Sequence, residues 1–284
     1  MKFGIYIAPT DNPHLFASMA ATIEDHGFDS VFLPEHTHVP IDVQEHRPGG
    51  SLLPHDAFKG GDPFIHLAAA AARTERLLLG TGAVLLSQRD PLVLAKIVSS
   101  LDRLSNGRVV LGFGAGWSRR ELENHGINPK KRWSVYEEKM LALRELWTKD
   151  VSEFHGEHVN FGALNQSPKP VQTPHPPMWV SANGPTAATL AGTVADGWQP
   201  ILLPDAAPFP LAERIAEIWG LAADAGRPRP TVTLFVFTNT PEPTEIENLE
   251  SAGVDRCVYR VVGGPASEVA PILSGYTAVA ALFT

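Results

Sequence analysis

The chain has 284 residues, 44% hydrophobic and 19% charged, which is enough to bury one large core in a single domain over residues 1–284. Its net charge of −8, without a long Lys/Arg cluster, disfavours a nucleic-acid partner, and the single cysteine, Cys257, excludes a disulfide framework or thiolate metal cluster. The apolar run at residues 3–8 is too short for a signal peptide or membrane span, so a cytoplasmic protein without a membrane partner is expected.

Eight short β-type segments are expected, most of them apolar at consecutive positions, as in strands buried on both faces of a parallel sheet. They lie at 3–7, 30–33, 77–81, 109–113, 178–181, 198–201, 231–237 and 256–262. Helical patterns lie between and after them at 14–26, 64–72, 91–104, 132–147, 185–194, 208–225, 244–252 and 266–273. Strict alternation predicts an α/β fold, a (β/α)8 TIM barrel; a doubly wound open sheet is disfavoured because no Gly-rich turn follows the first strand.

Two segments are longer than a barrel requires, at residues 38–62 and 121–132. Both would leave the C-terminal ends of strands, which form the face where barrels of this type carry their active sites. We therefore expect loop insertions at the C-terminal face, with 38–62 acting as a lid or a substrate wall.

Titratable side chains directly follow the second predicted strand. Glu35, His36 and His38 come after the apolar residues 30–33, on the expected functional face. We interpret His36 as an acid/base or coenzyme-facing residue. Two alternatives remain open: His36 and His38 could be a metal-binding pair, or Glu35 and His36 could only form a hydrogen-bonded rim.

Three glycines alternate at the end of the fourth predicted strand: Gly112, Gly114 and Gly116. Successive strand side chains point to opposite faces, so one face would lack side chains and a flat ring system could approach it closely. A simple bend at the barrel rim explains the same glycines equally well.

The fifth predicted strand runs into a helix through small residues. Ser181, Ala182, Asn183, Gly184 and Thr186 lie at this turn. Exposed backbone N–H groups at a helix N-terminus form an anion site, and two hydroxyls add donors, so a coenzyme phosphate is expected here. An ordinary capped turn is the alternative, because Asn-Gly-Pro is common loop chemistry.

Taken in order, these segments resemble the luciferase-like monooxygenase superfamily, and specifically its branch of deazaflavin (coenzyme F-420)-dependent oxidoreductases. The stretches that carry the resemblance are 28–36 (FDSVFLPEH), 79–82 (LGTG), 89–108 (RDPLVLAKIVSSLDRLSNGR), 111–117 (LGFGAGW) and 195–198 (ADGW). The resemblance implies a barrel that binds the deazaflavin or FMN at its C-terminal mouth, usually in a homodimer. It also implies a cis peptide between Gly82 and Ala83 that supports the coenzyme ring.

The resemblance completes the predicted site. The residues expected to bind the coenzyme are Glu35, His36, Thr81, Gly82, Ala83, Gly114, Ala115, Gly116, Ser181, Ala182, Asn183, Gly184 and Thr186. The catalytic candidates are His36, Glu35 and Trp117, and no metal is expected. Relatives that oxidise sugar phosphates carry a glutamate where this chain has Trp117, so a sugar-phosphate dehydrogenase is not expected.

The predicted reaction is hydride transfer between C5 of the deazaflavin and a small organic substrate, with His36 stabilising charge or moving a proton. An FMN-dependent monooxygenase of the same fold is the alternative. A metal-dependent hydrolase using His36 and His38 is remote, because Asn183 and the glycines at 263–264 follow strands that would have to supply further ligands. A coenzyme-binding protein without enzymatic activity is a further alternative.

Overall fold

Nine parallel strand segments form a closed barrel in the computed structural model, which describes residues 1–7, 11–41, 60–203, 210–237 and 242–283. The segments are β1 (Lys2–Ile7), β2 (Ser30–Leu33), β3 (Leu78–Leu85), β4 (Val109–Gly114), β7 (Met178–Val180), β8 (Gly197–Trp198), β9 (Ile201–Leu202), β10 (Thr231–Val236) and β11 (Arg256–Val261). Because β8 and β9 both pair with β10 and β10 also pairs with β11, the sheet closes with eight staves. The predicted (β/α)8 barrel is confirmed.

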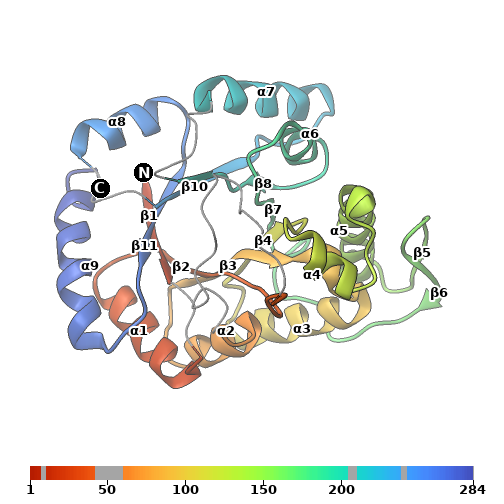
Figure 1. Cartoon of the computed structure of the whole chain (residues 1–284), viewed down its shortest axis with the longest axis horizontal. Helices are drawn as coiled ribbons and strands as arrows, with labels where there is room; N and C mark the ends of the chain where they lie inside the picture. The colour runs from red at the N-terminus through yellow and green to blue at the C-terminus, as the bar shows by residue number, and fades with distance from the viewer. Residues whose placement is uncertain (8–10, 42–59, 204–209, 238–241, 284) are drawn as a thin grey trace.

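Helices surround this barrel, as Figure 1 shows. They are α1 (Pro13–Asp25), α2 (Pro63–Ala71), α3 (Pro91–Leu104), α4 (Arg119–Asn124), α5 (Arg132–Thr148), α6 (Pro185–Thr193), α7 (Leu211–Asp224), α8 (Pro243–Ser251) and α9 (Ala266–Ala280). Asn12, Asp62 and Asp90 start α1, α2 and α3: each side chain accepts a backbone N–H of the first turn, and a proline follows. This combination satisfies orphan donors and presets the helical φ angle.

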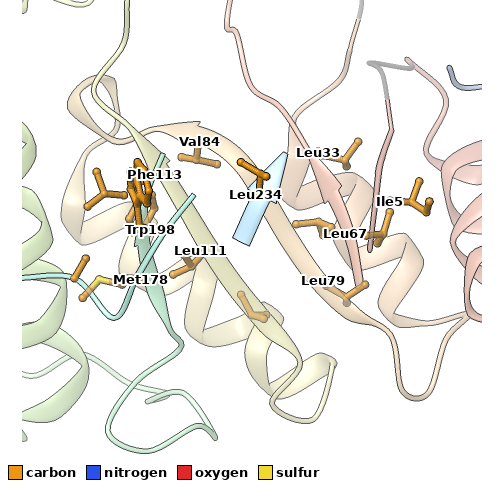
Figure 2. Close-up of a cluster of buried hydrophobic side chains, with 14 of the residues drawn as sticks. Ile5, Leu33, Leu67, Leu79, Val84, Leu111, Phe113, Met178, Trp198 and Leu234 are labelled. Atoms are coloured by element: carbon orange, nitrogen blue, oxygen red, sulfur yellow. The ribbon is translucent and has the colours of Figure 1, made fainter. Parts of the chain in front are cut away.

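The main hydrophobic core lies between the strands and the surrounding helices. Figure 2 shows part of it, with Ile5, Leu79 and Phe113 projecting from the barrel wall and Leu67 contributed by α2. A second, smaller cluster containing Phe32, Val110, Trp179, Phe235 and Val258 fills the inside of the barrel.

Glycines make room for the rings inside the barrel. A Cβ on Gly80 would overlap the ring of Phe32, and a Cβ on Gly82 would overlap the ring of Phe235. The barrel is therefore a packed solid rather than a channel, and any ligand has to bind at one of its ends.

The structure departs from the predicted elements in three places. An antiparallel hairpin of β5 (Ser152–His155) and β6 (Asn160–Leu164) follows α5; it was not predicted, because its strands are short and mostly outside the core, without a continuous apolar run. The sixth stave is split at residues 199–200, where a proline cannot donate a ladder hydrogen bond. The last helix continues beyond the expected residue 273, with Pro271 inside it.

The two predicted insertions have different outcomes. The segment at 121–132 is largely helical, because α4 and a short 3-10 turn at Pro129–Lys131 occupy it. Most of the predicted 38–62 segment, residues 42–59, lies outside the described residues. Within the described part of the chain, every helix is too short or too polar to cross a lipid bilayer.

Candidate active site

The ends of β2, β3, β4 and β7 meet at the C-terminal mouth of the barrel and bring the predicted segments together. The N–H of Glu35 donates to the carbonyl of Ala83 at 3.1 Å, and the N–H of Ser181 donates to the carbonyl of Phe113 at 2.8 Å. Four stretches that lie far apart in the sequence thus form one continuous rim, as parallel strands in register require.

His36 is held by a carboxylate that was not among the predicted site residues. Its Nδ1 lies 2.8 Å from Oε2 of Glu121, and the other carboxylate oxygen accepts the backbone N–H of Thr37 at 3.1 Å. The Glu121 residue is 1% exposed, whereas the His36 side chain is 14% exposed. The histidine therefore reaches the mouth and the glutamate lies behind it.

The charge of Glu121 is stabilised by its partners. Burial alone would raise the pKa of this carboxyl group, but the hydrogen bond and charge of His36 and the N–H of Thr37 outweigh it and hold the pKa below its ordinary value. Helix α4 orients the residue, because Ser118 caps the helix and accepts the N–H of Glu121 at 3.3 Å.

A sequence signal for this arrangement exists but is incomplete. Ser118 and Glu121 match the Ser-x-x-Glu pattern of a capping box, which predicts a helix start at α4. The pattern would direct the carboxylate back to its own helix, whereas the structure directs it to His36, 85 positions away in sequence. Only the fold reveals this contact.

Trp117, predicted as a catalytic candidate, stands beside the same histidine. The two ring centroids are 5.7 Å apart with an interplanar angle of 73°, an edge-to-face contact. The indole is partly exposed and precedes the Ser118 cap of α4. Trp117, in the connection before α4, and Glu121, in the first turn of α4, thus both contact His36.

Glu35 has a different environment from its neighbour His36. Its carboxylate accepts the N–H of Leu85 at 2.8 Å and Nε of Arg89 at 2.7 Å, and a second guanidinium nitrogen also contacts it. Arg89 bridges onward to Asp62, the cap of α2, at 2.6 Å. Although burial lowers the pKa of Arg89, its hydrogen bonds and charge interactions with Glu35 and Asp62 raise it overall. Glu35 therefore braces the rim, and its predicted catalytic role stays a prediction.

The peptide bond between Gly82 and Ala83 is cis, as expected from the family resemblance. The register between β3 and β4 shifts between Gly82 and Val84. The Thr81 hydroxyl donates to the carbonyl of Gly112 at 2.9 Å, which places this side chain within the sheet. Coenzyme contacts of Thr81, Gly82 and Ala83 stay predictions.

The predicted side-chain-free face of Gly112, Gly114 and Gly116 is wrong as a continuous surface. Gly112 faces the barrel interior, where its missing Cβ leaves room for the side chain of Gln199. Gly116 has a φ of +80°, so the extended geometry on which the prediction depended ends before it. Gly114 alone matches the expectation, because a Cβ there would meet only ordinary contacts at 3.4 Å or more. Ala115, between them, is buried.

The predicted phosphate turn leads into α6. Gly184 is its N-cap and has no side chain to satisfy the first N–H groups, while Gly184 and Thr186 are exposed. The Asn183 side chain is already engaged, since it accepts the N–H of Ile201 at 2.9 Å and donates to its carbonyl at 2.8 Å. Ala182 accepts the indole N–H of Trp198 at 2.8 Å through its carbonyl. Anion binding would therefore use the backbone of this turn.

The second histidine of the metal hypothesis, His38, belongs to an outer hydrogen-bond chain. Its Nδ1 lies 2.9 Å from the Thr37 hydroxyl and its Nε2 lies 2.8 Å from the Asn124 amide, while His125 Nε2 lies 2.7 Å from the same hydroxyl. Among the described residues, no group of three or more His, Cys, Asp or Glu side chains is arranged to hold a metal ion.

The luciferase-like monooxygenase family model matches residues 1–247 of the chain. An uncharacterized protein of Mycobacterium tuberculosis is 35% identical over 275 residues, with 95% of each chain covered. An F420-dependent glucose-6-phosphate dehydrogenase of Nakamurella multipartita is 33% identical over 189 residues, which cover 66% of this chain and 51% of that protein.

Solved structures give the same picture of the fold. An F420-dependent secondary alcohol dehydrogenase in complex with an F420-acetone adduct has a TM-score of 0.78 at 19% identity, and the monooxygenase RslO1 from Streptomyces bottropensis has a TM-score of 0.79 at 23% identity. In both comparisons 98% of each chain is covered, and at these identities the likeness shows the fold alone. Because the family model spans most of its length, the chain belongs to the luciferase-like monooxygenase family.

Proposed function

We propose that this protein is a deazaflavin (coenzyme F-420)-dependent oxidoreductase that transfers a hydride to or from a small organic substrate. The observation that carries the proposal is His36, a partly exposed imidazole at the mouth whose Nδ1 is bound by the buried carboxylate of Glu121. The cofactor class is supported by relatives that bear F420 in their names. Trp117 argues against a sugar phosphate as the substrate.

Three features of the site fit a flat ring with a phosphate-bearing chain. Gly114 carries no side chain, and a Cβ there would meet Ala83 and Leu85 only at ordinary contact distances of 3.4 and 3.5 Å, which suits the approach of a ring. The carboxamide of Gln88, beside Gly116, has both polar atoms buried without a hydrogen-bond partner, and a pyrimidine edge offers a complementary donor and acceptor. The uncapped start of α6 offers N–H groups to a phosphate.

When bound, the deazaflavin supplies a carbon that accepts or donates a hydride. The residues of the chain supply the rest of the chemistry. His36 holds or moves a proton at the ring nitrogen that does not face Glu121, Trp117 packs against it, and Glu35 with Arg89 keeps the rim rigid. Backbone N–H groups of the turn at 184–187 orient the phosphate.

Coenzyme binding tests the proposal directly. Fluorescence titration of the purified protein with coenzyme F-420 and, separately, with FMN is expected to give micromolar or tighter binding of F-420 and weaker binding of FMN. Tight binding of FMN without binding of F-420 would overturn the proposal and favour the FMN-dependent monooxygenase. Binding of neither would remove support for both redox assignments.

A further inference from the structure

We infer that Glu121 is a positioning residue that fixes the tautomer of His36. The inference about catalysis rests on the proposed function, whereas the effect on the imidazole is a property of the protein alone. It starts from the two contacts of one carboxylate: Oε2 faces Nδ1 of His36 at 2.8 Å, and Oε1 faces the N–H of Thr37 at 3.1 Å.

The chemistry of the carboxylate determines which nitrogen of the histidine carries a proton. An ionised carboxylate only accepts hydrogen bonds, so Nδ1 of His36 has to be the donor. Nε2 is then the nitrogen whose protonation changes when the ring gains or loses a proton. Glu121 thereby assigns the two ring nitrogens of His36 different roles, one structural and one chemical.

The burial of Glu121 separates positioning from direct catalysis. At 1% exposure it is closed off from the mouth, so it acts on a substrate only through His36. Glu121 also accepts a hydrogen bond from the backbone N–H of Thr37, which anchors the residue next to the histidine. A buried carboxylate requires such partners, because an unpaired buried charge is costly. The same helix carries Glu123, which is exposed.

The variant Glu121→Gln makes a sharp test because it keeps the shape and changes the hydrogen-bond inventory. An amide has one acceptor oxygen and one donor nitrogen. If the oxygen continues to accept the N–H of Thr37, the nitrogen faces Nδ1 of His36 and donates to it. The histidine is then expected to switch to the tautomer that carries its proton on Nε2.

Nuclear magnetic resonance of protein labelled with 15N in its histidine rings measures this switch without coenzyme or substrate. The His36 signals are assigned by their loss in His36→Gln, and Glu123→Gln serves as the matched control. We expect a protonated Nδ1 in the wild type and the control, and a protonated Nε2 in Glu121→Gln. An unchanged His36 tautomer in Glu121→Gln would overturn the inference.

Folding and coenzyme binding are measured in parallel. Thermal unfolding checks that each variant is folded, and Glu121→Leu, which offers neither donor nor acceptor, is the second variant; a mixture of His36 tautomers is expected there, and a pure Nδ1-protonated ring would contradict the inference. Affinity for coenzyme F-420 is expected to stay within about threefold of the wild type in Glu121→Gln, because Glu121 is closed off from the mouth. Failure of all proteins to bind F-420 would refute the proposed function and leave the tautomer result standing.

Discussion

The carboxamide of Gln199 occupies the space that a Cβ on Gly112 would fill. A Cβ at this position would overlap the amide oxygen of Gln199 and the carbonyl oxygen of Thr81, and the amide nitrogen of Gln199 donates to that same carbonyl at 3.3 Å. The glycine is therefore required by the packing of the barrel interior beneath the site.

Replacing Gly112 is expected to damage folding. Gly112→Ala should lower the free energy of unfolding by roughly 1–3 kcal/mol, because a methyl group cannot be added without displacing Gln199 or the β3 backbone. Urea unfolding followed by circular dichroism measures the change. Gly114→Ala is the control and should stay close to the wild type; equal losses in both variants would contradict the assignment of the two glycines.

Gly114 is expected to matter for the coenzyme instead. Gly114→Val places branched methyl groups beside Ala83, where we propose that the ring lies, and should weaken F-420 binding at least tenfold with little change in stability. Fluorescence titration provides the affinity and thermal unfolding the stability. Unchanged affinity would show that the ring does not approach this strand.

These two glycines illustrate what the sequence could and could not provide. Strand and helix periodicity was sufficient for the barrel and for the collection of four segments at one mouth, whereas the cis peptide at Gly82 was expected only from the family resemblance. Spacing alone could not predict which glycine faces a ligand, because Gly112 makes room for Gln199, which lies in the break between β8 and β9, two staves away. Glu121 was missed for the same reason: its partner His36 is close only in three dimensions.

His36 is expected to contribute to turnover more than to binding. His36→Ala should reduce turnover with F-420 roughly 10²- to 10⁴-fold, the usual contribution of general acid–base catalysis, with coenzyme affinity mostly retained. The measurement is the rate of deazaflavin oxidation or reduction with a substrate found by screening the wild type. His155→Ala, on the exposed hairpin, is the control, and full activity of His36→Ala would favour a coenzyme-binding protein.

Acid should weaken the fold through Glu121. The pKa of this group is held below its ordinary value in the folded protein, so the unfolded chain binds its proton first as the pH falls. The stabilisation that the charged Glu121 contributes is complete above the pKa of this group in the unfolded chain. It is lost as the pH falls through the pKa of Glu121 in the folded protein. Chemical denaturation between about pH 7 and about pH 3 should show the advantage of the wild type over Glu121→Gln shrinking in acid; a constant difference would contradict the lowered pKa of Glu121.

We propose that the chain forms a homodimer through the outer surfaces of α2 and α3, which lie side by side in Figure 1. Ile65 on α2 is 61% exposed and Val93 on α3 is 58% exposed, so each of these neighbouring helices presents a large apolar side chain to solvent. The double variant Ile65→Glu/Val93→Glu should be monomeric by light scattering after gel filtration. Ile272→Glu on α9 is the control and should stay dimeric, and a monomeric wild type would refute the proposal.

Described residues that precede and follow the stretch at 42–59 are held at the barrel rim by hydrogen bonds. On its N-terminal side, Glu121 forms hydrogen bonds with His36 and Thr37; on its C-terminal side, Arg89 forms a hydrogen bond with Asp62. Both contacts are made by residues outside that stretch: Glu121 lies on α4, and Arg89 follows the 3-10 turn after β3. The described residues that precede and follow this stretch therefore each have an anchor of their own, the first on α4 and the second on the residue that follows β3 and its 3-10 turn.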